Sequence, residues 1–115
     1  MIFVSGGAGY IGSHACVELL NAGFDVTVFD NFCNSSPEAL SRVQKITGKG
    51  VEFIKGDCRD RASLTAALKQ SKAKAVIHFA GLKAVGESVE KPLIYYDNNV
   101  VGTLRLIEAM QECTV

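Results

Sequence analysis

The sequence predicts an α/β fold, with helices on both faces of a parallel sheet. Short apolar runs alternate with segments of helical periodicity, and no linker, repeat or low-complexity tract separates them. A glycine cluster directly follows the first apolar run, as in sheets of this kind that bind nucleotides. The chain has 115 residues, of which 48% are hydrophobic, enough for one domain with a buried core. We therefore expect residues 1–115 to form one continuous unit.

Four strands are predicted, at residues 2–5, 25–29, 51–55 and 75–79. The first and last are almost entirely apolar, which is typical of parallel strands buried on both faces. Because connections between parallel strands are right-handed, the predicted strand order is 3-2-1-4.

The first two helices have recognisable ends. The first is predicted at residues 10–22, with Gly23 as its stop and a buried stripe made of Ile11, Ala15 and Leu19. Ser36 and Pro37 suit the N-cap and first helical position of the second helix, which is predicted to run to about Lys45.

Two further helices complete the predicted fold. One spans residues 60–69. The last is expected to be one long helix over residues 91–111, begun by Lys91 and Pro92. Its predicted buried stripe consists of Val100, Leu104 and Ile107.

Composition excludes several function classes. Lys and Arg number 12, as do Asp and Glu, and no basic run is present, so nucleic acid is not an expected partner. No apolar stretch approaches the roughly 18 residues of a membrane span, and no targeting segment is recognised, so we expect no membrane partner and a cytoplasmic location. The four cysteines are scattered without metal-ligand spacing, so no metal site is predicted.

The glycine cluster carries the main functional signal. Gly7, Gly9 and Gly12 satisfy Gly-x-Gly-x-x-Gly, and Gly6 precedes them. Such glycines permit a tight turn, let the main chain approach a pyrophosphate and let the following helix lie close to the sheet. Free amides at the helix start then face the anion. The alternative at this point is a turn that only joins a strand to a helix.

Asp30 favours the binding interpretation. It ends the second predicted strand, 18 residues after Gly12, near the ~20-residue spacing of a carboxylate that binds ribose hydroxyls. A carboxylate there repels a 2′-phosphate, and residues 31–37 contain no Arg or Lys, so NAD is favoured over NADP. A turn or cap role for Asp30 is the competing interpretation.

Other polar residues leave two interpretations open on their own evidence. Asp57 follows the third strand and either accepts from an adenine amino group or caps a turn. Lys83 follows the fourth strand and either meets a phosphate or is only solvated. Asn98 and its neighbour Asn99 interrupt an apolar helix, which suggests either a hydrogen-bonding task or surface placement. His14 and His78 are assigned no role.

Several segments together resemble the UDP-glucose 4-epimerases, a family of the extended short-chain dehydrogenase/reductases with a Rossmann-type sheet. The glycine turn names only the superfamily. The segments that resemble the epimerases are residues 5–14, 30–35, 56–57, 78–88 and 95–100, of which 79–88 and 95–100 are the most particular.

The resemblance implies an NAD-binding domain. With the turn glycines, the predicted cofactor-binding residues are Gly6, Gly9, Tyr10, Ile11, Gly12, Asp30, Asn31, Phe32, Cys33, Asn34, Ser35, Asp57, Cys58, Phe79, Ala80, Gly81, Leu82, Lys83 and Asn98. Tyr10 and Ile11 are implied at the phosphates, residues 30–35 at the ribose, and Asp57 with Cys58 near adenine.

The family interconverts UDP-glucose and UDP-galactose through a 4-keto intermediate, with a Tyr-x-x-x-Lys pair as its base. No tyrosine of this chain has lysine four positions later. We therefore expect a truncated, N-terminal NAD-binding part without catalytic residues or substrate domain, from a parent enzyme that forms a homodimer. The alternatives are another NAD-dependent sugar-nucleotide dehydratase or decarboxylase, and a non-catalytic NAD-binding module.

Overall fold

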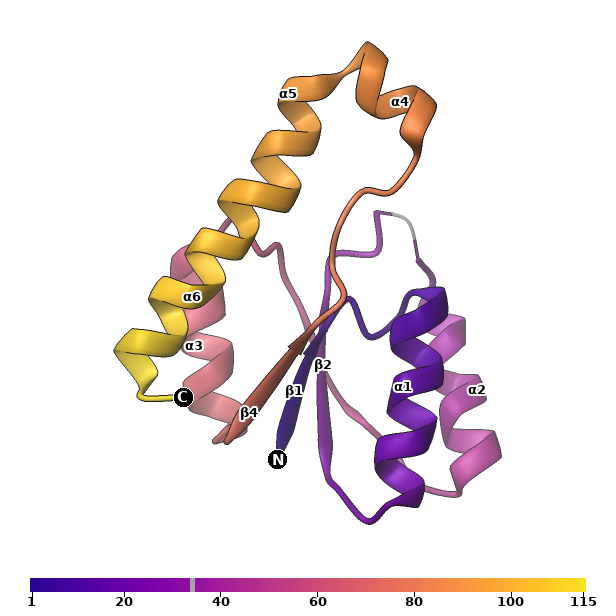
Figure 1. Ribbon diagram of the computed structural model, residues 1–115. Coiled ribbons are helices and arrows are strands. Elements are labelled where there is room, and N and C mark those ends of the chain that lie inside the picture. The colour runs from indigo at the N-terminus through magenta and orange to yellow at the C-terminus, as the bar shows by residue number, and fades with distance from the viewer. Residues whose placement is uncertain (34) are drawn as a thin grey trace.

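The computed structural model describes residues 1–33 and 35–115 and contains a four-stranded parallel sheet. Its order is β3-β2-β1-β4, which confirms the predicted topology (Figure 1). The strands are β1 (Ile2–Ser5), β2 (Val26–Asp30), β3 (Glu52–Lys55) and β4 (Ala75–His78), each within one residue of its predicted ends.

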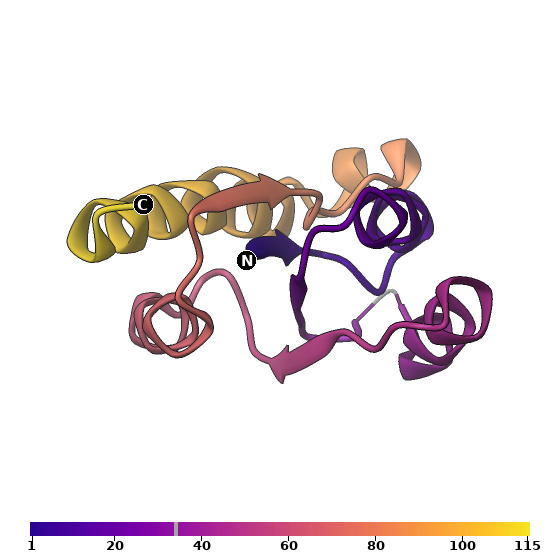
Figure 2. The same ribbon diagram turned by 90° about the horizontal axis from the view of Figure 1, so that it is seen from below.

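Helices cover both faces of the sheet, as predicted (Figures 1 and 2). Helices α1 (Tyr10–Asn21) and α2 (Pro37–Thr47) lie together on one side, and α3 (Arg61–Ser71) packs with α6 (Gly102–Cys113) on the other. None of the helices in the described part of the chain is both long enough and apolar enough to span a bilayer.

Strand alternation divides the apolar side chains between two cores. Phe3 and Phe29 belong to the core beneath α3 and α6, whereas their neighbours Val4 and Val28 belong to the core beneath α1 and α2. All four are fully buried. Both faces of β1 and β2 are therefore sealed, which leaves the ends of the strands as the places where a ligand has access.

Side-chain caps fix where two helices begin. The Ser36 hydroxyl accepts a hydrogen bond from the Glu38 amide at 3.2 Å, and Pro37 takes the first helical position, as predicted. Asp60 was expected inside the third helix, but it lies just before it and accepts from the Ser63 amide at 3.2 Å.

The predicted long C-terminal helix is confirmed in extent but not in uniform winding. Helical backbone runs without a break through α5 (Pro92–Tyr95), a π-helix η1 (Tyr96–Val101) and α6. A short helix before it, α4 (Val85–Glu90), was not predicted. The break at Lys91 has a local cause, because Pro92 disfavours helical geometry in the residue before it.

The stripe predicted for the last helix faces outward, and the one predicted for α1 is only partly buried, with Leu19 packed against the core. Val100, Leu104 and Ile107 are each about half exposed, whereas the buried residues of α6 are Gly102, Leu106 and Ala109. In α1 the predicted stripe begins at Ile11, which is 55% exposed, whereas the buried residues are Gly12, Cys16 and Leu20. Each buried face begins with a glycine, because a small residue lets the helix approach its neighbour closely.

A partly buried chain of hydrogen bonds joins the end of β4 to β1 and α6. The Thr103 hydroxyl donates to the Asn99 carbonyl at 2.6 Å, so it accepts from His78 Nε2 at 3.1 Å. His78 Nδ1 then accepts from the Ser5 hydroxyl. Burial, with a smaller effect of Lys83, lowers the pKa of His78. His78 therefore acts as a neutral structural link.

We predict that Gly12→Ala destabilises the fold by about 1 to 3 kcal/mol, the usual cost of overpacking. A Cβ at Gly12 would fall on the carbonyl oxygen of Gly6, which is main chain and has no room to move. Urea unfolding measures the change. Gly50→Ala is the matched control, because a Cβ at Gly50 meets nothing within 4 Å. Equal stability of the two variants would contradict this account of the turn.

We predict that the free energy of unfolding falls as the pH is lowered below about 6.5, the unperturbed pKa of histidine. The folded-state pKa of His78 lies lower, so the unfolded chain takes up its proton first. Stability is therefore complete above pH 6.5 and declines toward the folded-state pKa. Thermal unfolding at pH 5.5 and 7.5 tests this. His78→Gln should flatten the difference, whereas exposed His14→Gln should preserve it.

Candidate functional site

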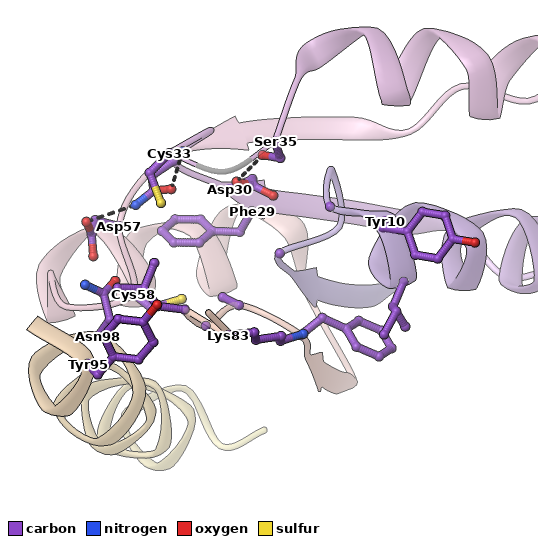
Figure 3. A pocket seen from close by; sticks show the side chains of 18 of the residues that line it. Tyr10, Phe29, Asp30, Cys33, Ser35, Asp57, Cys58, Lys83, Tyr95 and Asn98 are labelled. Atoms are coloured by element: carbon purple, nitrogen blue, oxygen red, sulfur yellow. Dashed lines mark hydrogen bonds between the residues drawn. The ribbon is translucent and has the colours of Figure 1, made fainter. Parts of the chain in front are cut away.

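The loops that follow the four strands enclose a cavity of about 500 Å³ (Figure 3). The structure brings most of the predicted cofactor residues to its wall. Those that line it are Gly6, Gly9, Tyr10, Ile11, Asp30, Asn31, Cys33, Ser35, Asp57, Cys58, Phe79, Ala80, Gly81, Leu82, Lys83 and Asn98. This position, beyond the carboxyl ends of parallel strands, is where ligands bind in open α/β sheets.

Three predicted residues are not among those lining residues. Gly12 packs against the Gly6 main chain, so its place is structural. Phe32 adopts a φ of 60°, and its ring packs on that of Phe53 with centroids 4.8 Å apart. Asn34 lies outside the residues that the structure describes.

The turn after β1 brings main chain from two strands into contact. Gly6 has a φ of 72°, and a Cβ there would lie 2.5 Å from the backbone nitrogen of Ala80, beyond β4. Helix α1 then begins with Gly9 as its N-cap, so no side chain covers the first helical amides. These amides and the positive end of the helix dipole suit an anionic group.

Asp30 connects this turn to the loop after β2. The residue is 8% exposed, and its Oδ2 accepts from the Ala8 amide at 3.1 Å. Its Oδ1 accepts from the Phe32 amide at 2.8 Å and from the Ser35 hydroxyl at 3.0 Å. A carboxylate offers about four acceptor positions, so Asp30 retains one for a ligand hydroxyl.

Asp57 is more completely satisfied. Its Oδ1 accepts from the amide and Nε of Arg59, at 2.9 and 3.0 Å. Its Oδ2 accepts from an Arg59 terminal nitrogen at 2.7 Å and from Asn31 at 3.2 Å. The side-chain bond from Arg59 is the main cause that lowers the pKa of Asp57 to about 2. Asp57 is therefore an anion held in a fixed orientation.

The loop after β4 is clamped from η1. The Asn99 carboxamide accepts from the Leu82 amide and donates to the Leu82 carbonyl, both at 2.8 Å. Gly81 lies beneath it, with a potential Cβ 3.2 Å from the Asn99 oxygen. Asn99 thus performs a hydrogen-bonding task, while Asn98 lines the cavity.

Five further residues line the cavity, and sequence analysis did not include them: Phe29, Gly56, Ala84, Glu87 and Tyr95. Tyr95 accepts from the Ala84 amide and donates to Glu87, both at 3.1 Å. The signal for Ala84, Glu87 and Tyr95 was available, because all three fall within the segments most particular to the family resemblance.

Neither Cys16 nor Cys58 is suited to act as a nucleophile. Burial raises the pKa of Cys58 to about 12 and that of Cys16 to about 11, so both thiols remain protonated. Within residues 1–33 and 35–115, no group of three His, Cys, Asp or Glu side chains is arranged to hold a metal ion.

Comparison with known families gives a match over almost the whole chain. Residues 3–115 match the family model described as GDP-mannose 4,6 dehydratase. That match fits the extended short-chain dehydrogenases/reductases.

Curated relatives are similar at high identity. A UDP-glucose 4-epimerase of Haemophilus influenzae is 60% identical over 99% of this chain, which spans 34% of that relative. A UDP-glucose 4-epimerase of Klebsiella pneumoniae is 54% identical, and the chain covers 82% of it. The chain thus spans about a third of the first relative and most of the second.

Solved structures agree with this grouping. A UDP-glucose 4-epimerase from Bifidobacterium longum, in complex with NAD⁺ and UDP, superposes with a TM-score of 0.96 at 53% identity. One from Stenotrophomonas maltophila, with bound NAD and formylated UDP-arabinopyranose, has a TM-score of 0.97 at 46% identity. The chain covers 34% of each structure, and each match covers 99% of the chain. The chain belongs to the UDP-glucose 4-epimerase family of the extended short-chain dehydrogenases/reductases.

Proposed function

We propose that the cavity binds NAD. One observation carries the proposal. A hydrogen bond from the Ala8 amide to Asp30 connects the uncapped start of α1 to a buried carboxylate. The helix start suits a pyrophosphate and the carboxylate a ribose hydroxyl. The epimerases from Bifidobacterium longum and Stenotrophomonas maltophila were crystallised with this cofactor.

The polar groups suggest how the dinucleotide lies. We place the pyrophosphate at the amides of Tyr10 and Ile11, and a ribose at the free acceptor position of Asp30. The negative charge of Asp30 opposes a 2′-phosphate, which favours NAD over NADP. The loop of residues 31–35 would complete the ribose site.

We place adenine beside Asp57 and Cys58. All four acceptor positions of Asp57 are occupied, and the bond from Asn31 is among the longest, at 3.2 Å. Among the described residues, the other donors to Asp57 all belong to Arg59, so the adenine amino group would displace Asn31.

The loop of residues 79–83 would contact the remainder of the cofactor, with the Lys83 charge available to a phosphate. Asn98 would provide a further contact from the end of the cavity that holds Asp57 and Cys58. The clamp from Asn99 holds this loop before any ligand arrives. The nicotinamide ring, when bound, supplies reversible hydride transfer.

We further propose that the intact protein is a UDP-glucose 4-epimerase that interconverts UDP-glucose and UDP-galactose. This chain would bind and orient the cofactor. The base is assigned to sequence outside residues 1–115, because no tyrosine here has lysine four positions later. The names and high identity of the relatives support this assignment.

We propose that the intact protein is a cytoplasmic homodimer. The apolar side chains of Val100, Leu104 and Ile107 are about half exposed along η1 and α6. An exposed apolar row of this kind suits a subunit interface. The free cysteines are in keeping with a reducing compartment.

We predict that Asp30→Asn weakens NAD binding by about tenfold or more, because a hydrogen bond to a charged group contributes about 1.5 to 3 kcal/mol. The affinity for NADP should fall less, so the ratio of the affinity for NAD to that for NADP should decrease. Calorimetric titration of both cofactors measures this. Asp25→Asn is the control, since Asp25 is exposed and does not line the cavity. An unchanged NAD affinity in Asp30→Asn would remove Asp30 from the site.

We predict that the intact gene product converts UDP-galactose to UDP-glucose, whereas the isolated 115 residues do not. A coupled assay with UDP-glucose dehydrogenase measures the product. Calorimetry on the same isolated chain tests whether it retains NAD binding. Turnover by the isolated chain would show that an acid/base group lies within it and would contradict the assignment above.

A further inference from the structure

Arg59 holds together two walls of the cavity that are far apart in sequence. It lies in the loop between β3 and α3, and three of its nitrogens bond to Asp57 as described above. Its remaining terminal nitrogen donates to Asp97 of η1 at 2.9 Å. Asp57 lines the cavity, and Asp97 directly precedes Asn98, which also lines it. The guanidinium therefore links the end of β3 to η1.

The segments on either side of this bridge pack closely. A Cβ at Gly102 would lie 3.6 Å from Cβ of Cys58 and 3.9 Å from Cγ of Arg59. The first turn of α6 therefore lies beside the loop that carries Arg59. Figure 3 shows Asp57, Cys58 and Asn98 at the end of the cavity opposite Tyr10.

Stability alone does not explain so specific a bridge. The side chains of Arg59 and Asp97 are 42% and 50% exposed, and ion pairs this exposed contribute about 0 to 1 kcal/mol. Geometry is the larger effect, because the planar guanidinium fixes the direction of each carboxylate that it binds. A shift of about 1 Å in a binding group is enough to change affinity or rate strongly.

A second arginine makes a similar bridge away from the cavity. Arg61 contacts Glu108 at 3.6 Å and Glu112 at 3.2 Å, so it also ties the α3 side to α6. Neither Arg61 nor its partners line the candidate cofactor cavity. Arg61 is thus a matched control, of the same residue type and with comparable exposure but without a link to the cavity wall.

We propose that Arg59 is a positioning residue of the cofactor site, which sets η1, and with it Asn98, at a fixed distance from Asp57. This inference rests on the proposed binding of NAD. Arg59 makes no contact with the cofactor in this arrangement and acts through the two carboxylates.

Calorimetric NAD titration of the intact protein tests the proposal with Arg59→Met, Arg61→Met, Asp97→Asn and Arg59→Lys. Arg59→Met should raise the dissociation constant about tenfold, and Arg61→Met should leave it within twofold. Asp97→Asn should have an intermediate effect, because the bonds to Asp57 remain. Arg59→Lys should rescue only partly, since an ammonium is a point charge without the planar fork. An Arg59→Met dissociation constant within twofold of wild type would overturn the proposal.

Hydrogen exchange of the cofactor-free protein provides a readout that does not depend on NAD. Amides of residues 96–101 should exchange several-fold faster in Arg59→Met and at the wild-type rate in Arg61→Met. Unchanged exchange in η1 overturns the positioning role even when NAD binds normally. Absent NAD binding in wild type, with faster exchange in Arg59→Met, would overturn the proposed function but keep the bridge between η1 and β3.

Discussion

The contact between Gly6 and Gly12 is the constraint on which the rest of the site depends. The first turn of α1 lies directly against the Gly6 carbonyl, with no room for a side chain between them. This places the start of α1 over the end of β1, and it sends the main chain past Ala80 of the β4 loop. Two walls of the cavity are therefore set by main-chain packing, before any polar side chain contributes.

Three carboxylates then connect the remaining loops. Asp30 connects the turn to the β2 loop, Asp57 orients the β3 loop, and Asp97 extends the connection to η1. Each binds donors from neighbouring loops or helices, so the cavity is formed without a ligand. A preformed cavity lowers the ordering cost that a flexible cofactor would otherwise impose on the protein.

Sequence analysis predicts the strands and their order well, because a strand buried on both faces is a short apolar run with little ambiguity. It fails for the helix faces. Helices α1 and α6 carry apolar residues on more than one face, and the buried face is the one that begins at Gly12 or Gly102. When the buried face is predicted from the large apolar side chains, Ile11 or Leu104 is placed on it, whereas the face that packs closely in the structure carries a glycine.

In the candidate site, too, the sequence predicts some features and misses others. Asp30 is singled out by its spacing from the glycine turn, whereas Asp57 keeps two interpretations until the family resemblance assigns it. The link from Arg59 to Asp97 was missed because these two residues are 38 positions apart, and only the folded chain brings them together. His78 was missed for a similar reason, since its role depends on Ser5 and Thr103 from other elements.

Because residues 96–101 form the π-helix η1, the number of residues in this segment is as important for the site as their identity. Its wider turn lets adjacent asparagines serve separate tasks, with Asn99 on the β4 loop and Asn98 at the cavity. π turns occur mostly as single inserted turns within α-helices. Removal of one residue from 96–101 would restore ordinary winding and rotate one asparagine away from its partner. The segment should therefore tolerate no change in the number of its residues.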